Sequence, residues 1–151
     1  MLFKTHLVFA FLVFLIVQSV FPASKIVLLV SILFGALIVD IDSKKSKAGR
    51  FIGFRVLQFF VSHRGALHSI FTGFLLALII SFVNKIASFG FFLGYMSHLI
   101  LDSTTKSGAM LFWPLFHVRF RFIIKTGSLL EEIIFIGFIV LDLYFSVVYF
   151  L

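Results

Sequence analysis

Apolar runs of roughly membrane-span length constrain the fold of this chain more than any other feature. Five such runs occupy residues 7–21, 25–39, 63–83, 86–101 and 131–151, separated by short polar connections. A helix needs about 20 apolar residues to cross a bilayer. Hydrophobic residues make up 62% of the 151 residues and charged residues 13%, and a soluble domain of this size cannot bury that much apolar surface. The sequence predicts an all-α integral membrane bundle of about five transmembrane helices, forming one membrane domain over residues 1–151.

Two stretches depart from a simple series of spans. The run 25–39 is short and stops at Asp40-Ile41-Asp42, so we expect its polar end to lie below the membrane surface, in a cavity lined by protein. Residues 51–62 follow a basic loop at 43–50 and mix apolar side chains with Arg55 and Gln58. This pattern suits an amphipathic helix lying in the interface, and the alternative is the solvated entrance to the next span.

The distribution of basic residues predicts the topology. With five spans, the N-terminus and the loops after the second and fourth runs share one side, and eleven of the thirteen Lys and Arg residues lie there. Lys25 and Lys85 lie on the opposite side. The positive-inside rule makes the basic side cytoplasmic, so we expect a multi-pass protein of the plasma or inner membrane with a cytoplasmic N-terminus. The net charge of +7 favours membrane lipids as partners. Nucleic acid ranks low because no groove-reading motif is present, and the oligomeric state stays open.

Imidazole and carboxylate groups gather at the ends of the spans that face this basic side. His98 and Asp102 are four residues apart and share one face of a helix, where they can hold a metal ion or form a simple hydrogen-bonded pair. Asp142 lies partway along the last run without an evident function, and we interpret His117 as a surface residue. The groups at the basic side are His6, Asp40, Asp42, His63, His68, His98, Asp102, Glu131 and Glu132.

These residue types indicate a particular metal chemistry. The chain has no cysteine, so thiolate ligands are excluded, and imidazole with carboxylate suits zinc, and also manganese or iron. We therefore expect one or two divalent ions, with zinc preferred. Ser69, Ser97 and Thr105 are the expected hydrogen-bond partners of the ligating imidazoles. The candidate metal ligands are His6, Asp40, Asp42, His63, His68, His98 and Asp102.

Several candidates also have a plain structural interpretation. Asp40 can cap or hydrogen-bond the basic loop, and Asp42 can pair with a loop lysine or arginine. His6 can be an interfacial histidine without a task. Of the two adjacent glutamates, Glu132 suits a solvated acid in the first turn of a helix, and Glu131 is the better functional candidate.

A series of short motifs runs in order along almost the whole chain: His6, Asp40-Ile-Asp42-Ser, Ser46 with Gly49-Arg50, His63-Arg-Gly with His68-Ser, Gly94-Tyr with Ser97-His98 and Asp102, Thr105 with Gly108, and Trp113-Pro114. This series resembles the YdjM-like family of membrane-bound proteins, for which a metal-dependent hydrolase activity is inferred. Val39 and Leu67 stand where the family commonly has proline and threonine, and Lys106 replaces a frequent proline. More distantly, the order of the histidines and aspartates is similar to the metal-ligand order of zinc-dependent phospholipase C and related single-strand nucleases.

Ligand chemistry and resemblance together predict a membrane-embedded, metal-dependent hydrolase at the level of the cytoplasmic lipid headgroups. The expected substrate is a phosphoester or ester of a lipid, a lipid-linked compound or a small molecule. Asp40 would ligate metal or act as general base, Arg64 would hold phosphoryl oxygens, and Glu131 would assist catalysis. Two alternatives are a non-catalytic scaffold or regulator with a structural metal and, less favoured because the opposite side lacks ionisable groups, a metal or proton transporter.

Overall fold

The computed structural model describes residues 1–42 and 66–150, with the side chains of Asp42 and Phe150 excepted. Their secondary structure is helical, and within these ranges the only β-type pairings are two isolated bridges in the connection 104–128. The all-α membrane fold expected from the sequence is confirmed. The α-helices are α1 (Phe3–Val17), α2 (Lys25–Ile38), α4 (Ile70–Ser81), α5 (Lys85–Ser103) and α6 (Leu129–Phe150), and the short 3-10 helices are η1 (Gln18–Val20), η2 (Pro22–Ser24), η3 (Val39–Asp42) and η5 (Ala66–His68).

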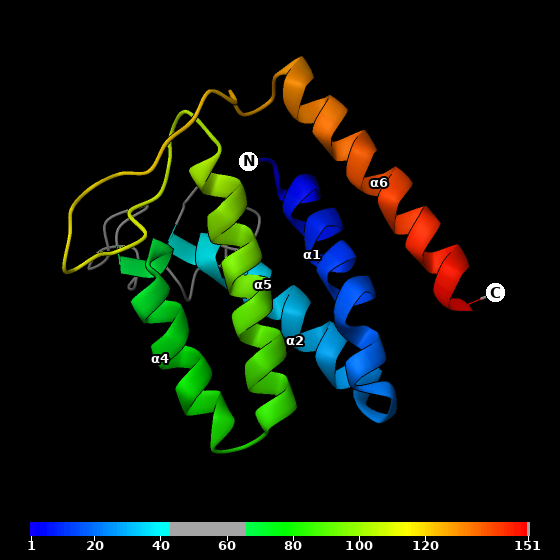
Figure 1. The fold of residues 1–151 in the computed structure, drawn as a ribbon. Helices are drawn as coiled ribbons and strands as arrows, with labels where there is room; N and C mark the ends of the chain where they lie inside the picture. Colours follow the sequence, from blue (N-terminus) through cyan, green and yellow to red (C-terminus); the bar gives the residue numbers. More distant parts are fainter. Residues whose placement is uncertain (43–65, 151) are drawn as a thin grey trace.

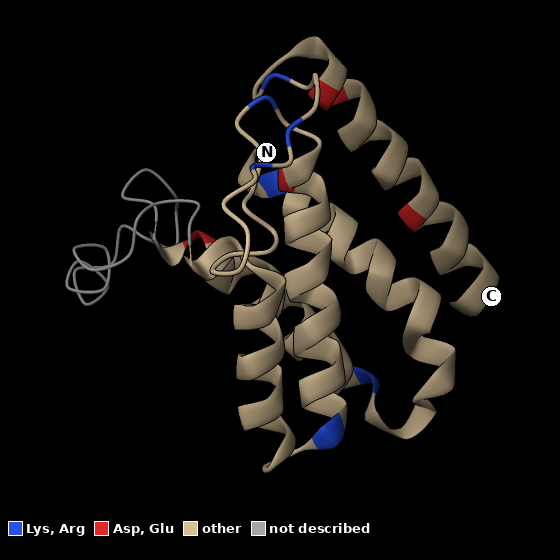
Figure 2. Cartoon of the chain, turned by 60° about the vertical axis from the view of Figure 1, so that its left-hand side comes forward, with Lys and Arg blue, Asp and Glu red and all other residues tan. Residues whose placement is uncertain are grey.

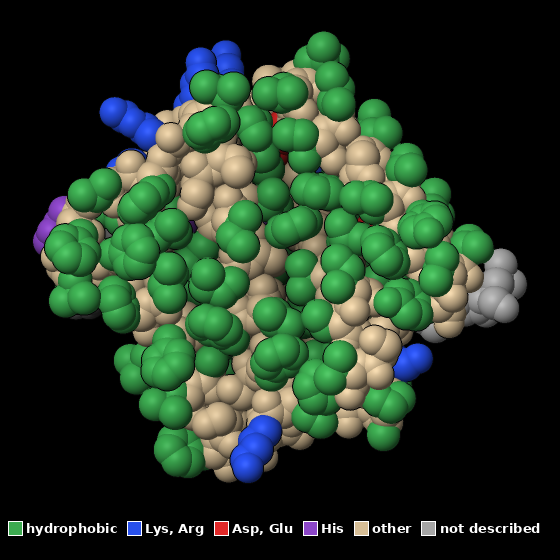
Figure 3. Space-filling model, viewed as in Figure 1, with side chains coloured by type: hydrophobic (Ala, Val, Ile, Leu, Met, Phe, Trp, Pro, Cys, Tyr) green, Lys and Arg blue, Asp and Glu red, His purple; other side chains and the backbone are tan. Residues whose placement is uncertain are grey.

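Helix α5 is the central element of the bundle (Figure 1). It contacts α1, α2 and α4, whereas α6 packs along α1 at the edge of the molecule. Large apolar side chains remain exposed on the outer faces of α2, α4 and α6, and hydrophobic side chains are spread over the whole face drawn in Figure 3. An apolar exterior of this extent is what a helix bundle presents to lipid.

The helices differ in their capacity to cross a membrane alone. Within residues 1–42 and 66–150, three stretches are long and apolar enough, namely Phe3–Val20, Pro22–Ile41 and Leu129–Tyr149. Helix α4 has 12 residues and spans only about 18 Å. Helix α5 has 19 residues, but glycine, serine, histidine and aspartate interrupt its apolar sequence. The amphipathic segment expected at 51–62 lies outside the described residues.

Glycines bring α2 and α5 into close backbone contact. A Cβ atom added at Gly94 would lie 1.9 Å from the Ile32 carbonyl oxygen, and one at Gly35 would lie 2.1 Å from the Phe91 carbonyl oxygen. Small residues allow this approach in membrane proteins, where the helices associate by packing rather than by the hydrophobic effect. The residues of α5 at four-residue intervals, Gly90, Gly94, His98 and Asp102, lie on one helical face.

The ends of the bundle differ in charge. Helices α2 and α5 begin with Lys25 and Lys85 at one end, and the other basic positions of the described chain gather around the N-terminus and the connection 104–128 (Figure 2). That connection is held to itself by reciprocal hydrogen bonds of 2.9 Å between Ala109 and Phe120. Its turn at Gly108 has φ 65°, a left-handed conformation that glycine adopts without strain. The segregation of basic residues expected from the sequence is present in the described part of the structure.

Candidate metal centre

Five ionisable side chains from four elements converge at the basic end of the bundle, and we name them the His/Asp centre. His6 comes from the first turns of α1, Asp40 from η3 after α2, and His68 from η5 before α4. His98 and Asp102 come from the last turns of α5. The side chains of four members are at most 2% exposed, and that of Asp40 is 23% exposed. Charged side chains are rarely buried to this extent without a partner or a function.

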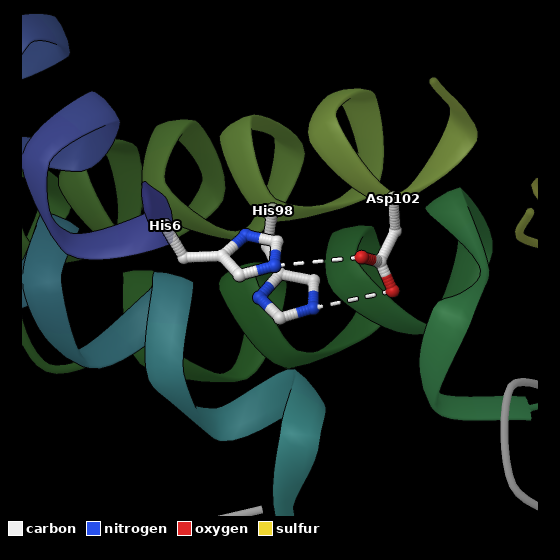
Figure 4. Close-up of side chains that lie close together, drawn as sticks. All are labelled: His6, His98 and Asp102. Carbon is white, nitrogen blue, oxygen red and sulfur yellow. Dashed lines mark ion pairs between the residues drawn. The ribbon is translucent and has the colours of Figure 1, made fainter. Parts of the chain in front are cut away.

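Asp102 is the hub of the His/Asp centre. Its Oδ1 accepts a hydrogen bond of 2.6 Å from the Met1 amino group and lies 3.4 Å from His6 Nε2. Its Oδ2 lies 3.4 Å from His68 Nε2 and 3.8 Å from His98 Nε2. Figure 4 shows the His6 and His98 rings side by side, with one nitrogen of each directed at the Asp102 carboxylate. The carboxylate thus touches three imidazoles.

A backbone carbonyl fixes the orientation and tautomer of His98. Its Nδ1 lies 2.7 Å from the Ala36 carbonyl oxygen, and because a carbonyl only accepts, Nδ1 carries the proton. Nε2 is then the atom available to bind a cation, and it faces Asp40 Oδ1 and Asp102 Oδ2, each at 3.8 Å. This buried atom has no hydrogen-bond partner among the described residues. Its burial is unfavourable unless a proton, water or metal compensates for it.

The separations of the donor atoms in the His/Asp centre are compatible with a bound metal. Hydrogen bonds span about 2.7–3.2 Å, shorter than the 3.4 and 3.8 Å separations between imidazole nitrogens and carboxylate oxygens. Ligands bound tetrahedrally to zinc lie about 3.4 Å from one another. Two sets of three donors meet within 4.8 Å, namely His6 with His98 and Asp102, and Asp40 with His68 and His98. The nitrogen and oxygen donors suit zinc, manganese or iron.

Tyr95 positions the segment that holds His68. Its ring covers Gly73 on α4, where a Cβ atom would lie 2.4 Å from a ring carbon, and its hydroxyl donates to the Leu67 carbonyl oxygen. Ser69 follows His68 and caps α4, accepting a hydrogen bond of 3.2 Å from the Phe71 N–H. Local contacts on both sides therefore fix the position of His68.

The structure assigns Glu131 contacts that differ from the catalytic role expected from the sequence. Its Oε1 accepts from the Leu2 N–H at 2.6 Å and from the Thr5 hydroxyl at 3.1 Å, and its Oε2 accepts from the Gly127 N–H at 2.6 Å. The carboxylate thereby satisfies N–H groups at the start of α1 and before α6. Among the described contacts it joins α6 to α1 and does not face the imidazoles.

The remaining sequence predictions have mixed outcomes. His63 and Arg64 lie outside the described residues, as does the side chain of Asp42. The expected role of three hydroxyls is wrong: Ser69 donates to the Trp113 carbonyl, Ser97 to Gly94 and Thr105 to Asp102. The imidazole partner that sequence reasoning missed is the Ala36 carbonyl. The sequence feature that could have predicted this partner is the position of Ala36 in the last turn of α2, because carbonyl groups there lack partners within the helix.

Comparison with known proteins identifies the family. The sequence is 37% identical over 122 residues to the uncharacterized protein YvsG of Bacillus subtilis, which covers 74% of this chain and 72% of that protein. It is 35% identical over 113 residues to the inner membrane protein YdjM of Escherichia coli, covering 65% of this chain and just 56% of that protein. No solved structure matches the chain. Residues 1–151 match the family described as YdjM inner membrane protein, and the chain belongs to that family.

Proposed function

We propose that this chain is a membrane-embedded, metal-dependent hydrolase acting on a phosphoester or ester at the cytoplasmic headgroup level. The observation that carries the proposal is the convergence of three imidazoles and two carboxylates at one end of an apolar bundle. The unpartnered Nε2 of His98 supports a bound cation. When bound, such a cation lowers the pKa of a water ligand and polarises the scissile group.

Within the His/Asp centre, some residues would hold the metal and one would take part in the reaction. His98 and Asp102 are almost fully buried, and the Ala36 carbonyl orients the His98 ring, as the partners of metal-ligating histidines generally do. Asp40 is the more exposed carboxylate, with 23% of its side chain accessible. Because solvent reaches this carboxylate, it can accept a proton from a water molecule, as a general base must.

The location of the His/Asp centre supports a substrate at the membrane surface. The centre lies at the end of the bundle that holds the N-terminus and the connection 104–128. These segments carry five basic residues, Lys4, Lys106, Arg119, Arg121 and Lys125. The positive-inside rule makes this end cytoplasmic. Its cations would attract anionic headgroups or phosphoesters.

Metal analysis and turnover together test the proposal. The wild-type protein, purified in detergent without chelator and equilibrated with zinc, should retain at least one ion. His98→Ala should lose it, and His117→Ala, which changes an exposed histidine in the connection 104–128, should not. Asp40→Asn should keep the fold and reduce phosphoester hydrolysis by about 10²-fold or more, the range for a general base. A wild-type protein that binds no divalent metal would contradict the proposal.

One observation favours a second candidate, a non-catalytic scaffold with a structural metal. The side chains of His6, His68, His98 and Asp102 are 0–2% exposed, and closed sites of four ligands are typical of structural zinc. The scaffold requires tight metal binding without hydrolysis of any phosphoester or ester. An Asp40→Asn variant with undiminished metal content and undiminished biological activity would support it over the hydrolase.

A further inference from the structure

A groove beside the His/Asp centre has one apolar part and one cationic end. It lies between α5 and the connection 104–128, has a volume of about 460 Å³, and is distinct from the buried face of α5 that holds His98. Several of its side chains are exposed, including Ile100 at 52% and Phe122 at 66%. Its apolar lining consists of Met96, Leu99, Ile100, Leu111, Phe120 and Phe122.

The polar end of the groove contains one group that can bind an anion. Ser103 and Thr104 line it, but their hydroxyl protons are donated to the Leu99 and Leu101 carbonyls at 2.7 Å. Arg121 also lines it, is exposed, and makes no hydrogen bond or ion pair with any described residue. Its guanidinium therefore keeps all its N–H donors, in the planar arrangement that binds phosphate oxygens in pairs.

The charges around the groove also favour an anionic ligand. Residues 103–130 contain four basic side chains and no carboxylate, and Figure 3 shows basic side chains at this end above an apolar face. A second groove, of about 470 Å³, is lined by α2, α4 and α5 residues that include Val30, Phe34 and Ala87. No charged residue lines it, so it offers an internal comparison without a phosphate-binding group.

The direction of the groove matches the structure of a membrane lipid. Its lining on α5 extends from Ser103 at the basic end back to Met96, which is about 10 Å along the helix axis. A phosphate at Arg121 would lie at headgroup depth, and an acyl chain attached to it would run along Ile100 and Met96 into the hydrocarbon layer. A soluble anion would leave this apolar length exposed.

We propose that this groove binds an anionic phospholipid, with the phosphate on Arg121 and one acyl chain between α5 and the connection 104–128. The lipid site goes beyond the proposed function and depends on neither metal nor turnover.

Lipid retention on metal-free protein tests the lipid site. Detergent-purified protein in chelator is mixed with phosphatidylglycerol or phosphatidylcholine, and bound lipid is counted by native mass spectrometry. The wild type should retain phosphatidylglycerol preferentially, and Arg121→Gln should weaken that retention about tenfold, as expected for loss of a bidentate, charge-assisted contact. The matched control is Arg119→Gln: Arg119 has the same charge, lies outside the lining, and donates to the Ser107 carbonyl at 3.4 Å. It should change retention less than twofold.

A second pair of variants tests the acyl-chain part. Ile100→Trp fills the proposed groove and should reduce phosphatidylglycerol retention, whereas Val30→Trp fills the uncharged groove and should not. Both positions are exposed, at 52% and 60%, so the fold should tolerate them. Equal losses in Arg121→Gln and Arg119→Gln, or equal retention of the two lipids by the wild type, would overturn the lipid site. Because no metal is present, these outcomes are independent of the hydrolase proposal.

Discussion

Replacing Gly94 with alanine tests the close approach of α2 and α5 on which the His/Asp centre depends. The new Cβ would lie 1.9 Å from the Ile32 carbonyl oxygen and 2.7 Å from its carbonyl carbon. An ordinary carbon–oxygen contact needs about 3.3–3.6 Å, so the helices must separate by about 1.5 Å. A backbone carbonyl in a helix cannot rotate away as a flexible side chain can, and the separation cannot be avoided.

The displacement reaches the His/Asp centre directly. Ala36 is one turn beyond Ile32 on α2, and its carbonyl oxygen lies 2.7 Å from His98 Nδ1. A shift of about 1.5 Å would break this hydrogen bond, whose useful range ends near 3.2 Å. Asp40, which follows α2, would move with it, whereas metal ligands tolerate only about ±0.2 Å. We expect at least a tenfold loss of zinc affinity, the lower end of the range for loss of a partner of a ligating histidine.

Stability should fall as well, and a second glycine provides the matched control. Overpacking costs about 1–3 kcal/mol, and the gain in helix propensity from glycine to alanine offsets about 1 kcal/mol. Gly137 on α6 has no heavy atom within 4 Å of its ideal Cβ position, so Gly137→Ala should gain propensity alone. Because both variants gain this propensity, equilibrium unfolding in mixed micelles should separate them by the overpacking cost alone, about 1–3 kcal/mol. Equal stability and equal zinc content of the two would refute the described α2–α5 packing.

Three further predictions address α6, His68 and the topology. Glu131→Gln should lower the free energy of unfolding by about 2 kcal/mol, because the amide NH₂ cannot accept the hydrogen bonds that the buried carboxylate accepts. Glu132→Gln breaks an exposed ion pair with Lys4 and should cost less than ~1 kcal/mol. Equal effects of the two substitutions would contradict the role of Glu131 in joining α6 to α1. Tyr95→Phe should weaken metal binding several-fold in zinc titration by releasing the Leu67 carbonyl, and unchanged affinity would mean that His68 does not depend on this contact. Single cysteines at Lys85 and Lys125, in a chain without native cysteine, should label from opposite sides of the membrane, with Lys125 cytoplasmic; labelling from one side would refute the topology.

The sequence predicts which end of the bundle holds each functional group better than it predicts which helices lie next to one another. Apolar runs determine where each span ends, so His6, Asp40, His68, His98 and Asp102 could all be assigned to one end of the bundle. Glu131 lies at that same end, yet α6 packs on α1 at the edge of the bundle, and its carboxylate meets Leu2 and Thr5. The packing order of helices depends on their side-chain surfaces, which a pattern of hydrophobicity does not specify.

Two of the three hydroxyls expected beside the imidazoles bind a carbonyl of their own segment instead. Ser97 donates to the Gly94 carbonyl three residues earlier, and Thr105 donates to the Asp102 carbonyl in the same way. A serine or threonine in or next to a helix can always reach such a carbonyl without ordering another element. An imidazole on a neighbouring helix must compete with that local partner. The carbonyl of Ala36 takes this place for His98 because the last turn of α2 leaves it available.

The stripe of Gly90, Gly94, His98 and Asp102 links the packing of α5 to the chemistry of the His/Asp centre. Its two glycines let α2 approach, and the next residue of the stripe, His98, meets the Ala36 carbonyl of that helix and Asp40 just after it. The Met1 amino group lies 2.6 Å from Asp102 Oδ1, within ordinary hydrogen-bond distance. The imidazoles instead stand 3.4–3.8 Å from the carboxylates, with room for a cation between them. The same close helix packing that stabilises the bundle therefore also sets the separations between the nitrogen and oxygen donors of the His/Asp centre.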